Sequence, residues 1–276
     1  MSVFIQLLRP KNCVMAVLSV LIVALVAANL DLSSIPLIEV LAASMVVFLF
    51  TGAGNTLNDY LDRDIDRLNH PERPIPAGET SPRNAIIFSG VLFGLSIIMG
   101  LWLSLYCMLL ILFNLAIMLA YELRAKAKGL MGNLMISWLT ASLFLFGGLS
   151  VLEKFPDIME TVLFMFLLSF FATLGREVTK DIEDVKGDIG RNTLPMRIGV
   201  PRARNASYMA FFIAIGLSPM PYLFGIFGFY YLVTALFADA IFIYGASVLS
   251  RNPGKTSESA KLAMFIALAA FLLGGI

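Results

Sequence analysis

Five carboxylate and amide side chains lie close together in the segment that begins at residue 55. They are Asn55, Asn58, Asp59, Asp62 and Asp66. Most are three or four residues apart, so in a helix they share one face. Like charges this close repel one another unless a cation or a proton relieves them. The segment therefore indicates a site for a cation.

A second group of acids repeats this pattern much later in the chain. It consists of Glu177, Asp181, Asp184 and Asp188. Its three aspartates follow the three aspartates of the first group by 122 residues each, which indicates an internal repeat. We predict a single domain over residues 1–276, with pseudo-repeats at about 1–123 and 124–250. Each repeat would supply four helices, a ninth helix would follow, and the two acid groups would face each other across a central cavity.

Mg²⁺ is the cation that suits two such acid groups. It prefers hard oxygen ligands and is commonly bound through one or two carboxylates together with substrate phosphates. The spacing excludes an EF-hand calcium loop. Zinc is disfavoured because His70 is the only histidine, and Cys13 and Cys107 lie in other segments. A diphosphate held by Mg²⁺ between the acids explains the repeated spacing, whereas acids that only solvate loops or pair with arginines do not.

Basic side chains surround both acid groups, as an anionic substrate requires. Arg and Lys can hold phosphate oxygens by charge-assisted hydrogen bonds. The candidate diphosphate contacts are Arg63, Arg67, Arg73, Tyr121, Lys126 and Lys180. Membrane topology, or pairing with an acid, would explain any one of these bases equally well. Arg73, Lys126 and Lys180 are the candidates that we favour.

Long apolar stretches must position both acid groups. The chain is 59% hydrophobic and 14% charged, with a mean hydropathy of +0.85, which excludes an ordinary soluble domain. A helix that crosses the bilayer core needs roughly 20 mostly apolar residues. We therefore predict an all-α integral membrane protein with nine transmembrane helices. Their approximate ranges are 12–29, 36–54, 84–101, 103–122, 130–151, 157–176, 204–219, 222–249 and 260–276.

The basic residues of the loops predict how the chain is oriented. In an alternating nine-helix count they fall on one side, except Lys154, and that side is expected to be cytoplasmic. The N-terminus and the acid groups are then cytoplasmic, and the C-terminus is outside. Topology alone accounts for Lys261. Asp239, within the eighth stretch, is a candidate functional group because ionisable residues at that depth are costly, although helix pairing would also explain it.

At these residues the chain resembles the UbiA superfamily of intramembrane prenyltransferases. The residues that carry the resemblance are Asn58, Asp59, Asp62 and Asp66, in its NDxxDxxxD motif, and Asp181, Asp184 and Asp188, at its second aspartate-rich motif. The resemblance implies that Mg²⁺ ionises a prenyl diphosphate and that the prenyl group passes to an acceptor. It also implies that these seven residues are metal ligands, that the aspartates are catalytic, and that the basic residues above, with Asn58, contact the diphosphate.

Within that superfamily, three segments are most similar to an archaeal, lipid-forming branch. They are "NDYLDRDIDRLNHPERPIPAG", "GLMGN" and "REVTKDIEDVKGD". The likeness implies transfer of a geranylgeranyl group from geranylgeranyl diphosphate to geranylgeranylglyceryl phosphate, which forms the second ether bond of archaeal membrane lipids. The expected partners are the prenyl diphosphate, a lipid-like acceptor and membrane lipids, with no nucleic acid and no obligatory protein partner.

Two other functions remain as alternatives, beside a structural lipid-binding protein descended from an enzyme. The first is prenyl transfer to an aromatic quinone precursor or to a chlorophyllide-like acceptor, since those branches carry related "RPIP" segments. The second is a cation-coupled transporter. Transport sites lie near the bilayer midplane, whereas these acids lie at the ends of apolar stretches beside bases that suit phosphate, so we favour the enzyme.

Overall fold

The computed structural model describes residues 2–126, 128–185 and 192–274 of the chain. All regular structure in those ranges is helical, which confirms the predicted all-α class. Nine of the described helical segments are long and apolar enough to cross a membrane. They are α2 (Pro10–Ala27), α3 (Leu37–Asn69), α4 (Pro82–Leu103), α5 (Leu105–Ala120) with the π-helical turn η2 (Tyr121–Ala125), α6 (Leu130–Val151), α7 (Ile158–Asp184), α9 (Val200–Leu217) with α10 (Met220–Leu223), α11 (Phe229–Val248) and α12 (Pro253–Leu273).

Short elements connect these long helices. They are α1 (Val3–Leu8), the 3₁₀ turn η1 (Leu32–Ser34) and α8 (Leu194–Ile198). Arg9, between α1 and α2, has a φ of 51°, so the chain turns sharply there and α1 packs beside α3. The N-cap of α4 is Ser81, which accepts a hydrogen bond from the backbone N–H of Asn84.

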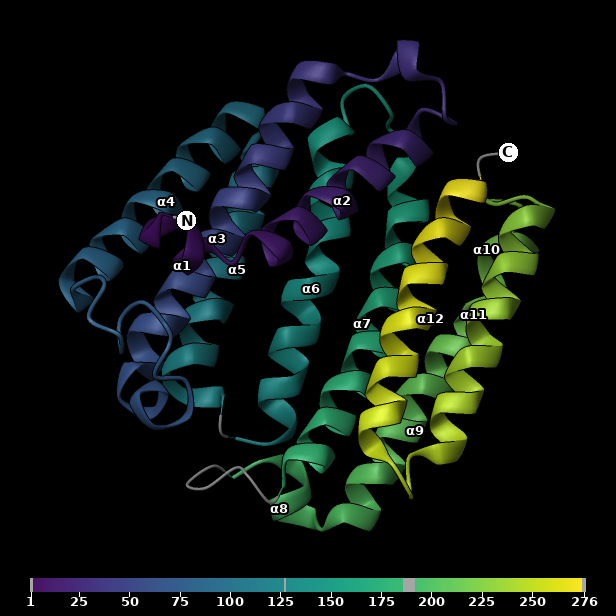
Figure 1. Ribbon diagram of the computed structural model, residues 1–276. Coiled ribbons are helices and arrows are strands. Elements are labelled where there is room, and N and C mark those ends of the chain that lie inside the picture. Colours follow the sequence, from purple (N-terminus) through teal and green to yellow (C-terminus); the bar gives the residue numbers. More distant parts are fainter. Residues whose placement is uncertain (1, 127, 186–191, 275–276) are drawn as a thin grey trace.

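Two of the long helices, α3 and α7, each pack against several others. Helix α3 contacts α2 and α4, whereas α7 contacts α6, α9 and α12. Figure 1 shows α1–α5 on one side of the molecule and α9–α12 on the other, with α6 and α7 between them. The ends of α3 and α7 that carry the acid groups lie at the same end of the bundle, the lower end in Figure 1. The internal repeat itself stays a prediction from the sequence.

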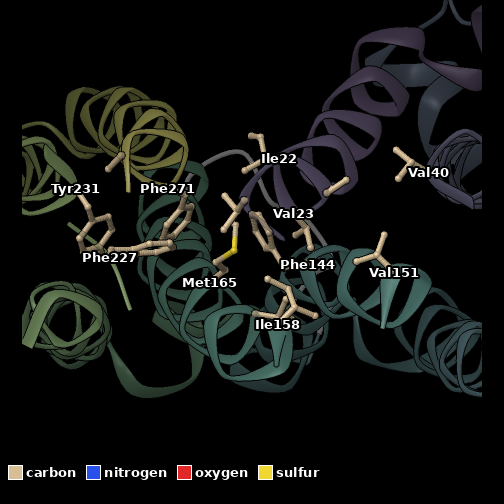
Figure 2. Close-up of a cluster of buried hydrophobic side chains, with 14 of the residues drawn as sticks. Ile22, Val23, Val40, Phe144, Val151, Ile158, Met165, Phe227, Tyr231 and Phe271 are labelled. Carbon is tan, nitrogen blue, oxygen red and sulfur yellow. The ribbon is translucent and has the colours of Figure 1, made fainter. Parts of the chain in front are cut away.

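A buried apolar cluster joins the two sides at the other end of the helices (Figure 2). It includes Val23 of α2, Phe144 of α6, Met165 of α7 and Phe271 of α12, each almost fully buried. Lipid tails are as apolar as these side chains, so close packing, rather than escape from water, holds membrane helices together. The cluster fixes α7 and α12 relative to α2 and α6.

Small residues allow α6 to approach its neighbours closely. A Cβ added at Gly147 would lie 3.1 Å from Cβ of Val23, and one at Gly148 would lie 2.7 Å from Cγ2 of Val162. Glycine at these two positions therefore lets α6 sit against both α2 and α7, as small residues do at other helix contacts in membranes.

Several helix boundaries differ from the predicted ranges. The sixth helix continues to Asp184 rather than ending at 176, and the seventh begins at Val200 rather than 204. Three further differences have identifiable reasons. The second helix does not end at residue 54 but continues to Asn69, as the spacing of its acids required. The eighth begins at Phe229 rather than 222, because the short α10 precedes it and Gly225, with a φ of 73°, turns the chain. The ninth begins at Pro253, since proline is well tolerated in a first helical turn.

Candidate active site

A cavity of about 1020 Å³ lies between the helices, with side chains of α2, α3, α5, α6, α7, α11 and α12 in its wall. The ends of α3 and α7 contribute polar groups, and the middle parts of the helices contribute apolar ones. Among the predicted metal ligands and diphosphate contacts, seven line it: Asn58, Asp62, Asp66, Arg73, Tyr121, Lys126 and Lys180. Most charged side chains therefore lie at one end, and the wall beyond them is largely apolar. Asp239 of α11, the candidate in the eighth stretch, also lines the cavity; it is buried and accepts a hydrogen bond from the hydroxyl of Ser218.

Arginines hold the aspartates at both ends of the first motif. Asp59 is 3% exposed and forms an ion pair with Arg9, whose guanidinium also donates to Oδ1 of Asn58 at 3.4 Å. Arg73 approaches from the loop after α3, with Nη1 2.6 Å from Oδ2 of Asp66 and 3.6 Å from Oδ1 of Asp59. Asp59 is not among the residues that line the cavity, so its role as a metal ligand stays a prediction.

A series of tight turns carries Arg73 back to α3. Its backbone N–H donates to the carbonyl of His70 at 3.1 Å, and its own carbonyl accepts from Ala77 at 2.9 Å. Beside it, hydrogen bonding lowers the pKa of Glu72, chiefly from its own backbone N–H and then from His70. Gly78 closes the loop with a φ of 77°, which glycine adopts without strain.

The π-helical turn η2 brings a lysine onto the first motif. Nζ of Lys126 lies 2.5 Å from Oδ2 of Asp62 and 3.1 Å from Oε2 of Glu122. Nδ2 of Asn58 donates to the other oxygen of Glu122 at 2.9 Å. The backbone N–H of Lys126 bonds to the carbonyl of Tyr121 at 2.9 Å, so one extra residue is accommodated in this turn, as is frequent at functional sites.

The second acid group is more open than the first. Asp181 accepts a hydrogen bond from Nδ2 of Asn133 at 2.9 Å, and Asp184 is exposed at the last residue of α7. Glu177 pairs with Arg176 at 2.7 Å, and both line the cavity. Asp188 lies outside the described residues.

Two predicted diphosphate contacts lie outside the cavity wall. Arg63 stacks on the ring of Tyr60 at 4.8 Å and donates to its carbonyl at 2.8 Å. Arg67 pairs with the exposed Asp64 at 3.2 Å. Both side chains are engaged with their own helix, so their diphosphate role stays a prediction.

The site also contains residues that the sequence patterns did not single out. They are Arg9, Glu122, Asn133, Thr173, Arg176 and Lys261. Lys261 had been explained by topology alone, yet it lines the cavity, as does Arg9. Glu122 directly follows Tyr121, a predicted diphosphate contact. That position is the only signal in the sequence that could have indicated its place in the site.

The site offers oxygen ligands that suit a hard cation and N–H groups that suit an anion. In the described part of the chain no three His, Cys, Asp or Glu side chains are gathered closely enough to hold a metal on their own. The carboxylates of Asp62 and Asp66 and the amide of Asn58 nevertheless line the cavity, and oxygen donors of this kind are what Mg²⁺ takes together with phosphate oxygens. Nε of Arg176 is buried without a partner among the described residues, which leaves a donor for an anion.

Comparison with other proteins places this arrangement in a known context. The model of the UbiA prenyltransferase family matches residues 16–269. Three relatives named digeranylgeranylglyceryl phosphate synthase align over nearly their full length. They come from Methanothermobacter thermautotrophicus (40% identical, covering 99% of this chain and 96% of that protein), Methanosarcina mazei (38%, 98% and 97%) and Methanococcus maripaludis (36%, 99% and 98%).

Solved structures agree with these alignments. A digeranylgeranylglyceryl phosphate synthase structure superposes with a TM-score of 0.87 at 33% identity, covering 99% of this chain and 98% of that one. A UbiA homologue from Archaeoglobus fulgidus, bound to DMAPP and Mg²⁺, shares the fold with a TM-score of 0.68 at 19% identity over 98% and 99% of the two chains. Its helices, its acid-lined cavity and its full-length relatives together identify this chain as a prenyltransferase that belongs to the UbiA prenyltransferase family.

Proposed function

We propose that this enzyme transfers a geranylgeranyl group from geranylgeranyl diphosphate to geranylgeranylglyceryl phosphate. The observation that carries the proposal is the cavity of about 1020 Å³, with acids and bases at one end and a largely apolar wall beyond them. The names of the full-length relatives support this choice of donor and acceptor. The product would contain the second ether bond of an archaeal membrane lipid.

Mg²⁺ suits the acid groups, and the two motifs would supply its protein ligands. The residues that would hold it are Asn58, Asp59, Asp62, Asp66, Asp181, Asp184 and Asp188. A bound metal ion would offset the charge that develops on the departing diphosphate. The neighbour bound to DMAPP and Mg²⁺ supports a divalent cation in this fold.

The chain's own cations would bind and orient the diphosphate. Arg73, Lys126 and Lys180 line the polar end of the cavity and can donate charge-assisted hydrogen bonds to phosphate oxygens. Lys126 and Arg73 already contact Asp62 and Asp66, so they lie next to the carboxylates that suit the metal. Preorganised donors of this kind stabilise leaving-group charge without reorganisation during the reaction.

The apolar wall would protect the reacting carbon. Departure of the diphosphate breaks an allylic C–O bond, and the acceptor hydroxyl oxygen forms the new C–O bond to the same carbon. Phe50, Met118, Leu143 and Leu168 are among the side chains that keep water from this part of the cavity. We assign the hydroxyl proton to the departing diphosphate, which lies beside it.

We also propose an orientation in the membrane. The N-terminus and both acid groups would face the cytoplasm and the C-terminus the outside, because the loop lysines and arginines gather at the acid-bearing end. Pseudo-repeats of about 1–123 and 124–250 would explain why two acid groups meet at that end.

Purified protein in detergent with labelled geranylgeranyl diphosphate tests the function. Geranylgeranylglyceryl phosphate and 4-hydroxybenzoate are supplied separately, with and without Mg²⁺, and the products are identified by mass spectrometry. We expect a diether phosphate only when Mg²⁺ is present. A prenylated aromatic product alone would move the enzyme to quinone synthesis, and solute uptake by proteoliposomes without any covalent product would favour a transporter.

A further inference from the structure

The proposed acceptor poses an electrostatic problem that the donor site alone does not solve. In a glycerol phosphate the reacting hydroxyl lies on the carbon next to the one that bears the phosphate ester. The acceptor phosphate, with about −1.5 to −2 charges at pH 7, must therefore sit close to the donor diphosphate in the same cavity. The two anions repel strongly in a site of low dielectric constant unless each has its own cations.

The cations beside the first motif are already engaged. Arg9 pairs with Asp59, Arg73 with Asp66, and Lys126 with Asp62 and Glu122. Their charges are balanced by the same carboxylates that suit a metal and a diphosphate. A second anion would need positive charge from another part of the cavity wall.

The opposite wall, formed by α7 and α12, offers that charge. Arg176 uses Nη1 for Glu177, but its Nε is buried and has no partner among the described residues. Thr173, three residues earlier and therefore on the same face, is 3% exposed, and its hydroxyl also lacks a partner there. Both side chains line the cavity. A buried hydroxyl and a buried guanidinium N–H left open side by side indicate a missing polar ligand.

Lys261 of α12 contributes a further cation to this wall. It lines the cavity, and no ion pair within 4 Å joins it to an acid in the described part of the chain. It lies eight residues after Pro253, or about 12 Å along the helix. Its side chain is exposed, so its ammonium is open to a ligand in the cavity that it lines.

Helix packing places Lys261 at the level of Arg176. A Cβ at Gly254, near the start of α12, would lie 2.6 Å from Oε1 of Glu183, near the end of α7. Lys261 is seven residues after Gly254, and Arg176 is seven residues before Glu183. The two helices run in opposite directions with the same rise per residue, so the two cations lie at matching heights. Ala172 of α7 and Ala260 of α12 belong to one buried cluster, which keeps the helices together there.

We propose that Thr173, Arg176 and Lys261 bind the phosphate monoester of the acceptor. This assignment rests on the proposed function and names a second anion site across the cavity from the first motif. The hydroxyl and guanidinium donate from α7, and the ammonium donates from α12. The site selects a phosphorylated acceptor and holds its neighbouring hydroxyl toward the allylic carbon of the donor.

Steady-state kinetics of Lys261→Met test the assignment. We expect the KM for geranylgeranylglyceryl phosphate to rise about tenfold or more, because a charge-assisted contact is lost, while the KM for geranylgeranyl diphosphate stays within about twofold. The preference for the phosphorylated acceptor over geranylgeranylglycerol, which lacks the phosphate, should fall by a similar factor. Lys261→Arg keeps the charge and should restore both values. Thr173→Val should weaken acceptor binding in the same direction.

Lys255→Met is the matched control. Lys255 is an exposed lysine on the same helix, and its Nζ lies 5.4 Å from the ring centre of Tyr244, outside the cavity wall. Its kinetics should match the unaltered enzyme. An unaltered enzyme that makes no diether would overturn the proposed function and this site together. Diether formation with an unchanged acceptor KM in Lys261→Met, or a rise in the donor KM instead, would overturn the acceptor site alone.

Discussion

At the scale of single residues, each carboxylate of the first motif is paired with a cation. Lys126 reaches Asp62, Arg73 reaches Asp66 and Arg9 reaches Asp59. Positive groups thus lie within contact distance of each carboxylate before any anion is bound. A diphosphate bound here would lie beside acids that suit a metal and bases that suit phosphate. This need for both kinds of charge explains why the densest charge in the chain lies at this helix end.

Replacement of Asp62 should lower the rate of prenyl transfer most directly. Asp62→Ala removes a carboxylate from the cavity wall and leaves Lys126 with only Glu122, so prenyl transfer should fall about 100-fold or more. Asp64→Ala is the control, since Asp64 is exposed and pairs with Arg67 on the same helix. Product formation per minute by each purified variant measures the effect, and turnover by Asp62→Ala equal to that of the control would refute the role.

The sequence predicted the acids better than their partners. Spacing of three and four residues placed Asn58, Asp62 and Asp66 on one face, and all three line the cavity. Arg9 could not be found in this way, because it lies 50 residues from Asp59 and belongs to no repeated pattern. Contacts between distant segments depend on how helices pack, which local spacing does not specify.

At the scale of helices, hydropathy predicted the number and order of the membrane-spanning helices but missed irregularities within them. The nine apolar stretches correspond to nine described helical spans. The π-helical turn of η2, which brings Lys126 onto Asp62, has no signature in the hydropathy of its segment. Tertiary contacts, such as the approach of Gly132 to the carbonyl of Ala125, accompany that turn. A fine adjustment of this kind follows from packing and not from composition.

The close contact of α6 with α7 gives a prediction for helix packing. Gly148→Ala would place a Cβ 2.7 Å from Val162, so the free energy of unfolding should drop by about 1–3 kcal/mol. Gly94→Ala, on α4, is the control, since a Cβ there meets nothing within 4 Å and alanine favours helices. Thermal unfolding in detergent compares them; equal midpoints for the two variants would show that α6 and α7 are less closely packed than described.

At the scale of the whole molecule, the orientation in the membrane can be tested with introduced cysteines. Lys154→Cys and Arg251→Cys lie in exposed connections at opposite ends of the bundle, and both native cysteines are buried. A membrane-impermeant maleimide added to spheroplasts should label position 154 and leave position 251 unmodified until the membrane is opened. Labelling of position 251 first would reverse the proposed orientation.

The whole account depends on one cavity that serves a prenyl diphosphate, a divalent cation and a lipid phosphate together. The most direct measurement gives purified enzyme geranylgeranyl diphosphate with equal concentrations of geranylgeranylglyceryl phosphate and 4-hydroxybenzoate, in Mg²⁺ or after chelation. We predict that mass spectrometry will find the diether phosphate as the main product in Mg²⁺ and none after chelation. Diether formed equally well without a divalent cation, or an aromatic product in its place, would contradict the account.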